Sequence, residues 1–403
     1  MKVLVVGSGG REHALAWALA KSQGVSEIVV CPGNGGTQWE GTAELAPCIS
    51  LSGEVKDLAP DYDLVVVGPE APLVQGLADQ LKVPVFGPSA RAAQVEASKL
   101  YAKEIMDRAG VPTAKTKTLG PKDVDQLEHF GLPIVIKDDG LAAGKGVGVF
   151  FELKPAQDFF AQLSQSTDRI FIEEYLEGPE LSVLAFCDGK GFRVMPPARD
   201  YKRRFENGEG PNTGGMGAIS PVPDIDDALM KQIETQVLAP VLSGLAKDNA
   251  AFVGVLYAGL KLTPEGPKVL EFNCRFGDPE TQVILPQFQG NLAKLMLSCA
   301  QGKIDDEHIE WSGQSHLGVV VASDGYPANY EKGLPITGLD QSGMPLIFQA
   351  GTRSEGDRVL TNGGRVLAVV GAGENLKEAS MKAYEGVNNL NFQGMVFRKD
   401  IGS

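Results

Sequence analysis

Cysteine, histidine and long hydrophobic runs are all scarce in this sequence, and each shortage excludes a class of protein. The chain has 5 cysteines, an odd number without a Cys-x-x-Cys pair, which argues against a disulfide framework and favours buried thiols in a reducing compartment. Its 4 histidines share no metal-ligand spacing, so no zinc site is expected. No apolar run approaches the roughly 18 residues of a membrane span, and no signal peptide is recognisable. We expect a cytoplasmic protein without a membrane partner.

Basic residues are fewer than acidic residues. The chain carries 37 Lys and Arg against 51 Asp and Glu, a net charge of −14, which opposes a general grip on nucleic acid. A phosphate ligand must therefore meet a locally basic site. The 403 residues are 43% hydrophobic and 22% charged, as in folded globular proteins. At roughly 150 residues per domain they leave room for about two to four domains.

The first hundred residues alternate short apolar runs with helical patterns, which is typical of βαβ units. Strands that are apolar throughout indicate a parallel, doubly wound sheet covered on both faces. Each predicted strand runs into a group of turn-forming residues: 7–10, 32–36, 68–70 and 87–89. Ligands of such sheets bind beyond the carboxyl ends of the strands, so these turns should share one crevice. Ser89 is predicted to cap a following helix that Gly110 ends.

The helix predicted after Ser89 places a domain boundary near residue 100, the pattern changes from Pro133 onward, and a third segment begins past Ser315. The middle part contains strands joined by glycine loops, which predict a small antiparallel lid, and further along a hairpin is predicted from 254–262 and 268–272. The last part combines strands with interspersed helix. The expected fold class is mixed α/β and α+β, with a doubly wound parallel N-terminal sheet. The predicted domains are 1–100, 101–314 with the lid at about 115–185, and 315–403.

Residues 7–12 (GSGGRE) begin like a dinucleotide fingerprint, but Glu12 occupies the position of the third glycine. A nicotinamide cofactor is therefore disfavoured. A helix N-terminus preceded by flexible glycines, with Arg11 beside it, suits a single phosphate group. A tight strand-to-helix turn without a ligand is the structural alternative.

A second glycine-rich segment, residues 138–148, follows Lys137 at the end of an apolar strand. Its spacing is not that of a Walker A loop, because three residues separate Gly140 from Gly144 and Gly146 stands where Ser or Thr would bind Mg²⁺. It is better explained as a hairpin tip that covers phosphates with backbone N–H groups, with Lys137 as a point charge beneath it. The alternative is a hairpin that is merely flexible.

The strand pattern of residues 268–275 places Glu271, Asn273 and Arg275 on one face. The two oxygen-bearing side chains suit a hard cation such as Mg²⁺, which takes one or two protein ligands together with substrate phosphates. Arg275 suits a transferring phosphoryl group. A solvated strand face is the alternative, and the polar run Gly277 to Glu280 that follows argues against it.

Together these segments resemble the ATP-grasp superfamily, and specifically the phosphoribosylamine-glycine ligases, also called glycinamide ribonucleotide synthetases. The resemblance runs the whole chain, and RFGDPE (275–280) is its most specific element. It is carried by the segments GSGGREHALAW (7–17), PGNGGT (32–37), VVGPEAPLV (66–74), GLAAGKGV (140–147), GPNTGGMGA (210–218), EFNCRFGDPETQ (271–282) and FRKDIG (397–402).

The resemblance implies a reaction of purine biosynthesis that joins glycine to 5-phosphoribosylamine and yields glycinamide ribonucleotide, ADP and phosphate. It implies ATP as a substrate, Mg²⁺ or Mn²⁺ as the metal, and a monomer or weak homodimer. The chemistry agrees with the residues, because a carboxylate must be activated as an acyl phosphate before an amine attacks it. Such a transfer needs positioning and charge neutralisation rather than a nucleophile, and a lid that excludes water.

The resemblance also implies roles for individual residues. Arg275, Lys137 and Asp278 are the expected catalytic residues, and Glu271 and Asn273 the metal ligands. The nucleotide is expected to meet the phosphate lysines Lys103 and Lys137, the glycine loop with Gly140, Gly144, Lys145 and Gly146, the adenine hinge Glu173, Glu174, Tyr175 and Leu176, and the ribose carboxylate Glu180. 5-Phosphoribosylamine is expected at Gly9, Gly10, Arg11, Asn34 and Glu70, and the region between the substrates at Asp200, Lys202, Gly214, Gly215 and Asp278.

Two positions depart from the family pattern. Asp138 replaces a common alanine and adds negative charge near Lys137, unless it points to solvent. Pro179 stands where a second acidic residue is common, which leaves Glu180 as the ribose candidate.

Three other functions fit these residues less well. Another ATP-grasp ligase or carboxylase of purine synthesis is disfavoured by the RFGDPE and GGMGA runs. A nicotinamide dehydrogenase is disfavoured by Glu12. An inactive nucleotide-binding regulator would lack the metal face that Glu271 and Asn273 supply.

Overall fold

The computed structural model describes residues 1–140, 146–339 and 345–403. Its N-terminal part is a five-stranded parallel sheet in the order β3-β2-β1-β4-β5. Strand β1 is buried at every position after Lys2, which confirms a sheet covered on both faces. The elements are β1 (Lys2–Gly7), α1 (Gly10–Ala20), β2 (Glu27–Pro32), β3 (Cys48–Ser50), α2 (Val55–Leu58), β4 (Leu64–Val67), α3 (Glu70–Val74), α4 (Leu77–Gln80) and β5 (Val85–Phe86).

The helix predicted after Ser89 is shorter than expected and has a different cap. The chain forms α5 (Gln94–Ala97) and then α6 (Lys99–Ala109), and the N-cap of α6 is Ser98, whose hydroxyl accepts a hydrogen bond from the backbone N–H of Tyr101 at 3.1 Å. Ser98 has extended backbone angles, so one continuous helix cannot pass through it. The predicted C-terminal end is correct, because Gly110 takes the left-handed conformation there.

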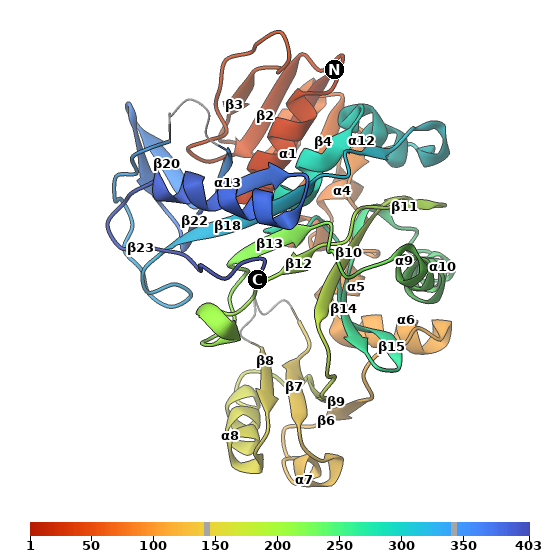
Figure 1. The fold of residues 1–403 in the computed structure, drawn as a ribbon. Coiled ribbons are helices and arrows are strands. Elements are labelled where there is room, and N and C mark those ends of the chain that lie inside the picture. Colours follow the sequence, from red (N-terminus) through yellow and green to blue (C-terminus); the bar gives the residue numbers. More distant parts are fainter. Residues whose placement is uncertain (141–145, 340–344) are drawn as a thin grey trace.

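At the place of the predicted lid, the chain forms a four-stranded antiparallel sheet in the order β6-β9-β7-β8 with its own apolar core. The strand from Glu180, which falls inside the predicted lid range of 115–185, belongs to the body sheet instead. Figure 1 shows the lid at the bottom of the view, with α7 and α8 beside its sheet and apart from the rest of the chain. The elements are β6 (Thr116–Leu119), α7 (Gln126–Phe130), β7 (Ile134–Asp138), β8 (Val147–Phe150), α8 (Leu153–Leu163) and β9 (Ile170–Glu174).

The body of the middle segment is the antiparallel sheet β11-β10-β14-β15. The predicted hairpin is present as β14 and β15, but β15 ends at Asn273, so Arg275 lies beyond the strand that was expected to carry it. The elements are β10 (Glu180–Asp188), β11 (Phe192–Val194), α9 (Asp227–Ile233), α10 (Ala239–Lys247), β14 (Val253–Thr263), β15 (Gly266–Asn273), α11 (Glu280–Ile284) and α12 (Leu292–Ala300).

The C-terminal sheet has the strand order β12-β13-β18-β22-β19, and β23 also pairs with β18. Two of its strands, β12 and β13, come from the middle of the chain. Helix α13 packs on β18 and β22, as Figure 1 shows. The sheet therefore fixes residues 199–220 against the C-terminal segment. The elements are β12 (Arg199–Asp200), β13 (Gly217–Ser220), β18 (Ser315–Ser323), β19 (Leu346–Gln349), β20 (Thr352–Glu355), β21 (Arg358–Thr361), β22 (Arg365–Gly373), α13 (Leu376–Asn388) and β23 (Met395–Val396).

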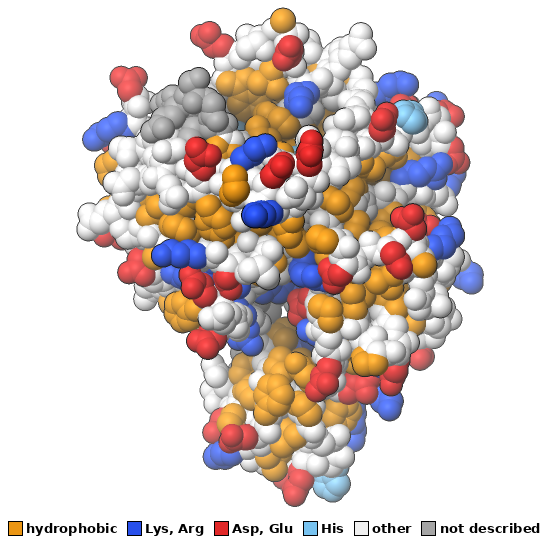
Figure 2. Space-filling model, viewed as in Figure 1, with side chains coloured by type: hydrophobic (Ala, Val, Ile, Leu, Met, Phe, Trp, Pro, Cys, Tyr) orange, Lys and Arg blue, Asp and Glu red, His pale blue; other side chains and the backbone are white. Residues whose placement is uncertain are grey.

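One apolar core runs through the N-terminal sheet, the middle sheet and the C-terminal sheet. In Figure 2 the surface is hollowed where the lid meets this body, and basic and acidic side chains gather in that hollow. Within the described parts of the chain, no helix has the length and apolar character needed to cross a membrane.

Candidate active site

Two predicted phosphate lysines share one buried carboxylate. Nζ of Lys103 on α6 lies 2.5 Å from Oε1 of Glu173, and Nζ of Lys137 on β7 lies 2.6 Å from Oε2. Burial would raise the pKa of Glu173, but Lys137 and Lys103 outweigh it and lower that pKa. Burial lowers the pKa of Lys103, and Glu173 opposes that shift. Two ammonium groups around one carboxylate leave one positive charge available to an anion.

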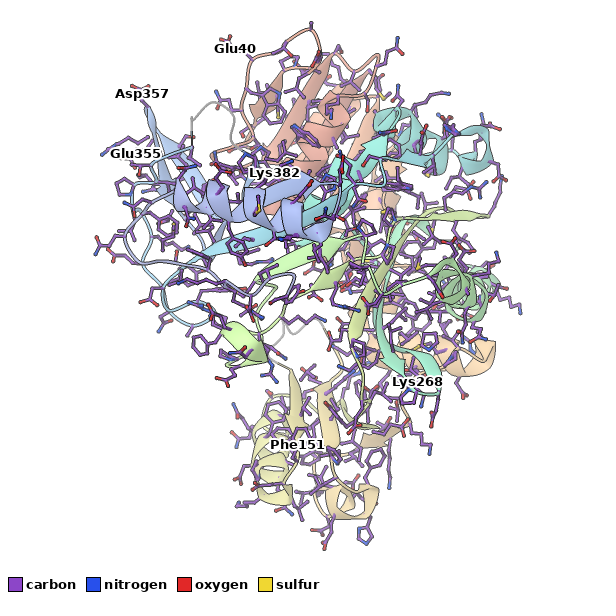
Figure 3. All side chains as sticks on the ribbon, viewed as in Figure 1. Glu40, Phe151, Lys268, Glu355, Asp357 and Lys382 are labelled. Atoms are coloured by element: carbon purple, nitrogen blue, oxygen red, sulfur yellow. The ribbon has the colours of Figure 1, made fainter. Side chains whose placement is uncertain are left out.

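The predicted hinge comprises Glu173 and Glu174 at the end of β9 and the two residues that follow the strand. Oε1 of Glu174 accepts a hydrogen bond from the backbone N–H of Lys115 at 3.1 Å, and Leu176 is buried. The ring of Tyr175 meets that of Phe151 edge to face, with centroids 5.4 Å apart. Figure 3 labels Phe151 on the lid, where it is 64% exposed, and Lys268 on β15. The hinge thus lies between the lid and the body.

Glu180, the predicted ribose carboxylate, already has two protein partners. Its Oε2 accepts a hydrogen bond from Nζ of Lys202 at 3.0 Å, and its Oε1 accepts one from Nζ of Lys261 at 3.2 Å. Burial opposes ionisation, but these two lysines hold the pKa of Glu180 at about 2. A ribose hydroxyl would have to share this carboxylate with them.

The base of the glycine loop is tied to the start of α6. Asp139 accepts hydrogen bonds from the hydroxyl of Ser98 and the backbone N–H of Leu100, and it pairs with Arg169. Nζ of Lys99 donates to the carbonyls of Asp138 at 3.2 Å and Gly140 at 2.5 Å.

Asp138 does not simply point to solvent. Its Oδ1 is buried and has no hydrogen-bond partner among the described residues. Gly146 is held at the base of the loop, because its carbonyl accepts the N–H of Asp138 at 2.8 Å. The predicted contacts of Gly144 and Lys145 fall outside the described residues.

Arg275 is surrounded by oxygen atoms. Its Nη2 donates to Oε1 of Glu96 at 3.1 Å and to Oδ1 of Asn273 at 3.0 Å, and its Nε donates to Oε2 of Glu70 at 3.2 Å. Burial would lower the pKa of Arg275, but Glu96 and Glu70 raise it, so the guanidinium keeps its charge. Asn273 thus lies beside Arg275 as predicted, although through a direct hydrogen bond rather than strand alternation. Glu271 and Asn273 do share a face of β15.

The start of α1 is filled by a glutamate. Glu12 is 2% exposed, and its Oε2 accepts the N–H of Gly9 at 2.5 Å, while its Oε1 accepts Nε of Arg11 at 2.6 Å. A Cβ atom on Gly68 would lie 2.0 Å from that Oε1, so the close approach of Glu12 requires glycine there. Glu12, which breaks the dinucleotide fingerprint, therefore organises this turn. Nη1 of Arg11 also donates a hydrogen bond to the carbonyl of Phe276 at 3.1 Å.

Asn34 joins the N-terminal domain to the C-terminal segment. Its Nδ2 donates to the carbonyls of Ser8 at 2.9 Å and Gln349 at 2.8 Å, and its Oδ1 accepts the N–H of Gly36 at 2.8 Å. The side chain that was expected to meet substrate is thus engaged by backbone groups of the protein.

Asp200 and Lys202 line a small polar cavity in the body. Burial raises the pKa of Asp200 to about 7, with Lys202 opposing the shift and Glu280 and Glu180 adding to it. The polar residues that line the cavity are Glu180, Ser182, Asp200, Lys202, Tyr257 and Glu271. The structure thus brings the predicted inter-substrate residues Asp200 and Lys202 next to the predicted metal ligand Glu271.

The remaining predicted residues meet at the junction of three segments. Asp278 lies close to Gly9, and the amide of Gln282, which packs against Gly10, donates to its Oδ1 at 2.9 Å. Arg365, which no sequence pattern indicated, lies 3.3 Å from that oxygen. Two names describe parts of the site. The nucleotide end is the set Lys103, Lys137, Glu173 and Glu180. The junction is the set Gly9, Arg11, Asn34, Glu70, Asp278 and Arg365.

Sequence reasoning missed Glu96, Lys99, Lys261 and Arg365. An acidic residue among the apolar positions of a predicted helix was the only available signal for Glu96. The other three stand in ordinary helix or strand patterns.

Comparison with known proteins covers nearly all of the chain. Family models described as phosphoribosylglycinamide synthetase match residues 1–96 (N domain), 97–281 (ATP-grasp domain) and 316–403 (C domain). The phosphoribosylamine–glycine ligase of Halalkalibacterium halodurans is 44% identical, covering 100% of this chain and 97% of that protein. The one from Nostoc sp. is 46% identical, covering 100% and 99%.

A solved structure agrees with these sequence matches. The phosphoribosylamine–glycine ligase of Thermotoga maritima superimposes with a TM-score of 0.87 at 37% identity, over 100% of both chains. The predicted resemblance and the predicted fold class are confirmed. The chain belongs to the phosphoribosylamine–glycine ligase family, whose members are also described as phosphoribosylglycinamide synthetases.

Proposed function

We propose that this chain joins glycine to 5-phosphoribosylamine at the expense of ATP, giving glycinamide ribonucleotide, ADP and phosphate in purine biosynthesis. The proposal is supported by family membership over the whole chain. The observation that carries it is the pair of buried lysines, Lys103 and Lys137, on the single carboxylate of Glu173. A site with one positive charge to spare suits the phosphates of ATP.

The reaction has two steps. A carboxylate oxygen of glycine attacks the γ-phosphorus of ATP, the bond from that phosphorus to the bridging oxygen breaks, and ADP leaves. The amine of 5-phosphoribosylamine then attacks the carbonyl of glycyl phosphate, phosphate leaves, and the nitrogen loses a proton. Both steps depend on positioning and charge neutralisation, which fits a site of lysines and arginine.

At the nucleotide end, Lys103 and Lys137 hold the phosphates, and the hinge backbone from Glu173 to Leu176 holds the base. Glu180 accepts ribose hydroxyls while Lys202 and Lys261 keep it ionised. The glycine loop that includes Gly140, Gly144, Lys145 and Gly146 covers the phosphates. Arg275 meets the charge on the transferring phosphoryl group, held in place by Glu70 and Glu96.

Glu271 and Asn273 fit a divalent cation, Mg²⁺ or Mn²⁺. They offer a carboxylate and an amide oxygen on one strand face, the donors that a hard cation takes alongside substrate phosphates. The described residues hold no cluster of three or more His, Cys, Asp or Glu side chains that would form a cage made of protein alone. A cation held there would neutralise phosphate charge during the transfer.

The second substrate is assigned to the junction. Gly9, Gly10, Arg11, Asn34 and Glu70 surround 5-phosphoribosylamine, and Asp200, Lys202, Gly214, Gly215 and Asp278 lie between it and glycine. Glu70 is the member with an accessible carboxylate, because its side chain is 35% exposed beside Arg275. A ligand hydroxyl can reach it from the solvent side.

The test is phosphate release with glycine, 5-phosphoribosylamine and ATP, each omitted in turn, together with mass spectrometry of the product. We expect full turnover and glycinamide ribonucleotide only with all three substrates present. Lys137→Gln should abolish most turnover, whereas the exposed Lys117→Gln serves as its matched control. Turnover with bicarbonate in place of glycine would contradict the assignment.

A further inference from the structure

Arg365, the first residue of β22, reaches from the C-terminal sheet into the middle segment. Its Nη1 donates to the carbonyl of Gly214 at 2.5 Å and to the carbonyl of Asp278 at 2.8 Å. The same nitrogen lies 3.3 Å from Oδ1 of Asp278. One guanidinium nitrogen therefore holds two backbone segments and one carboxylate.

A second side chain of the C-terminal segment holds the other side of Gly214. The backbone N–H of Gly214 donates to the hydroxyl of Tyr326 at 2.9 Å. Both polar backbone groups of this glycine are thus bound by the C-terminal segment. Arg365 and Tyr326 therefore hold the turn that contains Gly214 and Gly215 from the C-terminal side, while the hydroxyl of Thr213 accepts the N–H of Gly215 at 3.0 Å within the segment itself.

The glycine pair is required by this packing. A Cβ atom on Gly214 would lie 2.9 Å from Cζ of Arg365. On Gly215, whose φ is +113°, it would lie 2.5 Å from Cδ of Pro279. The glycines let Arg365 and the Asp278-Pro279 segment approach the turn closely.

Asp278 connects this cluster to the start of α1. Its Oδ2 lies 3.4 Å from the position that a Cβ atom of Gly9 would occupy. Burial would raise the pKa of Asp278, but Arg365 and Arg11 lower it, so a charged pair is retained. Among the described residues, none of the hydrogen-bond partners of Arg365 belongs to the nucleotide end.

We propose that Arg365 is a positioning residue for the second substrate. It holds the Gly214–Gly215 turn and Asp278 where they orient 5-phosphoribosylamine toward activated glycine, so the C-terminal domain completes the site. The inference rests on the proposed function, since it assigns the residue that aligns the second step. Nη1 alone makes the three contacts, so Arg365→Lys, which keeps the charge but not the planar guanidinium, tests whether charge by itself is enough to hold the turn and Asp278.

The experiment compares Arg365→Gln, Arg365→Lys and Tyr326→Phe with Arg358→Gln, an exposed arginine of the same domain whose side chain is 66% exposed. For each variant, the Michaelis constants for ATP, glycine and 5-phosphoribosylamine are measured. The ratio of ADP formed to glycinamide ribonucleotide formed is also recorded. That ratio rises above one when glycyl phosphate meets water before the amine, which a purely structural role would not cause.

Arg365→Gln should lower kcat/KM for 5-phosphoribosylamine by roughly 10- to 100-fold, the cost of a misplaced reactant. The ratio of ADP to product should rise, and the Michaelis constant for ATP should stay near the wild-type value. Arg365→Lys should be intermediate. Tyr326→Phe should lose roughly 3- to 10-fold, as for one hydrogen bond, and Arg358→Gln should match wild type.

Three results would overturn the inference: an unchanged ADP-to-product ratio in Arg365→Gln, an equal loss toward ATP, or a defect in thermal stability alone. If Arg365→Gln does not fold, Arg365→Lys and Tyr326→Phe decide by the same ratio. A wild-type enzyme inactive toward glycine and 5-phosphoribosylamine would instead refute the proposed function, so the two failures are distinguishable.

Discussion

The nucleotide end and the junction are built differently. At the nucleotide end, Lys103, Lys137 and Glu173 all belong to the middle segment, and their partners were among the residues predicted together. At the junction, each predicted residue has a partner far away in the chain. Examples are Asn34 with Gln349 and Asp278 with Arg365. A motif therefore marks a functional position in both regions, but it does not reliably identify the partner: Lys261, which binds Glu180 at the nucleotide end, was missed although it lies in the same segment.

The largest effect is expected at the nucleotide end, from Glu173→Gln. The substitution leaves two buried ammonium groups without their carboxylate, which should destabilise the nucleotide-free protein by about 3 to 5 kcal/mol. Denaturant unfolding measures this loss, with Glu177→Gln as the matched control because Glu177 is exposed. Mg-ATP should stabilise the variant more than wild type, since its phosphates replace the lost charge. Wild-type stability would mean that the lysines are not coupled through Glu173.

Arg275 lies between the two regions and tests whether they act together. Arg275→Ala should lower kcat by roughly 10²- to 10³-fold, about 3 to 4 kcal/mol, because it removes a donor to the developing charge. ATP affinity should change much less, and Arg275→Lys should fall between the two. Steady-state kinetics with a thermal melt separates catalysis from folding. Wild-type turnover, or unfolding as the sole defect, would assign Arg275 a structural role.

Glu70→Ala asks whether the junction binds a different substrate from the nucleotide end. Losing a hydrogen-bonding carboxylate should raise the Michaelis constant for 5-phosphoribosylamine by roughly 10- to 100-fold. The constant for ATP should stay nearly unchanged. Glu96→Gln is the comparison, because it also pairs with Arg275 but is buried and beyond the reach of a ligand. A selective loss of ATP affinity in Glu70→Ala would mean that the sites are assigned to the wrong domains.

The smallest effect concerns pH and the contact between the N-terminal and C-terminal domains. Burial lowers the pKa of His13 from 6.5 to about 4, and its Nδ1 accepts the N–H of Gln349 at 2.9 Å. As the pH falls, His13 takes up a proton in the unfolded chain before it does so in the folded protein. The stability that neutral His13 contributes is therefore present above pH 6.5 and is lost as the pH drops toward 4. The loss from His13 should be about 1 kcal/mol between pH 7 and pH 5.5.

Urea unfolding of wild type and of His13→Asn at those two pH values measures this loss as the difference between the two proteins. The difference is needed because burial raises the pKa of Asp200 to about 7 and lowers the pKa of His316, so both groups also titrate in this window. His13→Asn keeps an acceptor for Gln349 but cannot titrate, so the His13 contribution should be missing from its pH dependence. The same pH dependence in His13→Asn and wild type would exclude His13 as the source.

The sequence predicted much of the fold, and it failed where long-range contacts override local pattern. The buried parallel strands and the hairpin of β14 and β15 follow from residue periodicity and turn chemistry. The helix after Ser89 is interrupted at Ser98, which has extended backbone angles, and the turn before it directs Glu96 inward to the backbone N–H of Cys274 at 2.7 Å and the side chain of Arg275. Strand alternation likewise ended at Asn273, two residues before Arg275.

The sequence by itself determined the order of the elements, the glycine-bearing strand ends and the charged residues of the site. These depend on side-chain periodicity and on local backbone preferences, which neighbouring residues express. Only the tertiary structure decided that Asn34 binds Gln349 and that Arg365 holds Gly214 and Asp278. Those contacts join residues of separate segments, so they exist only after the domains pack on one another, and no local pattern specifies that packing.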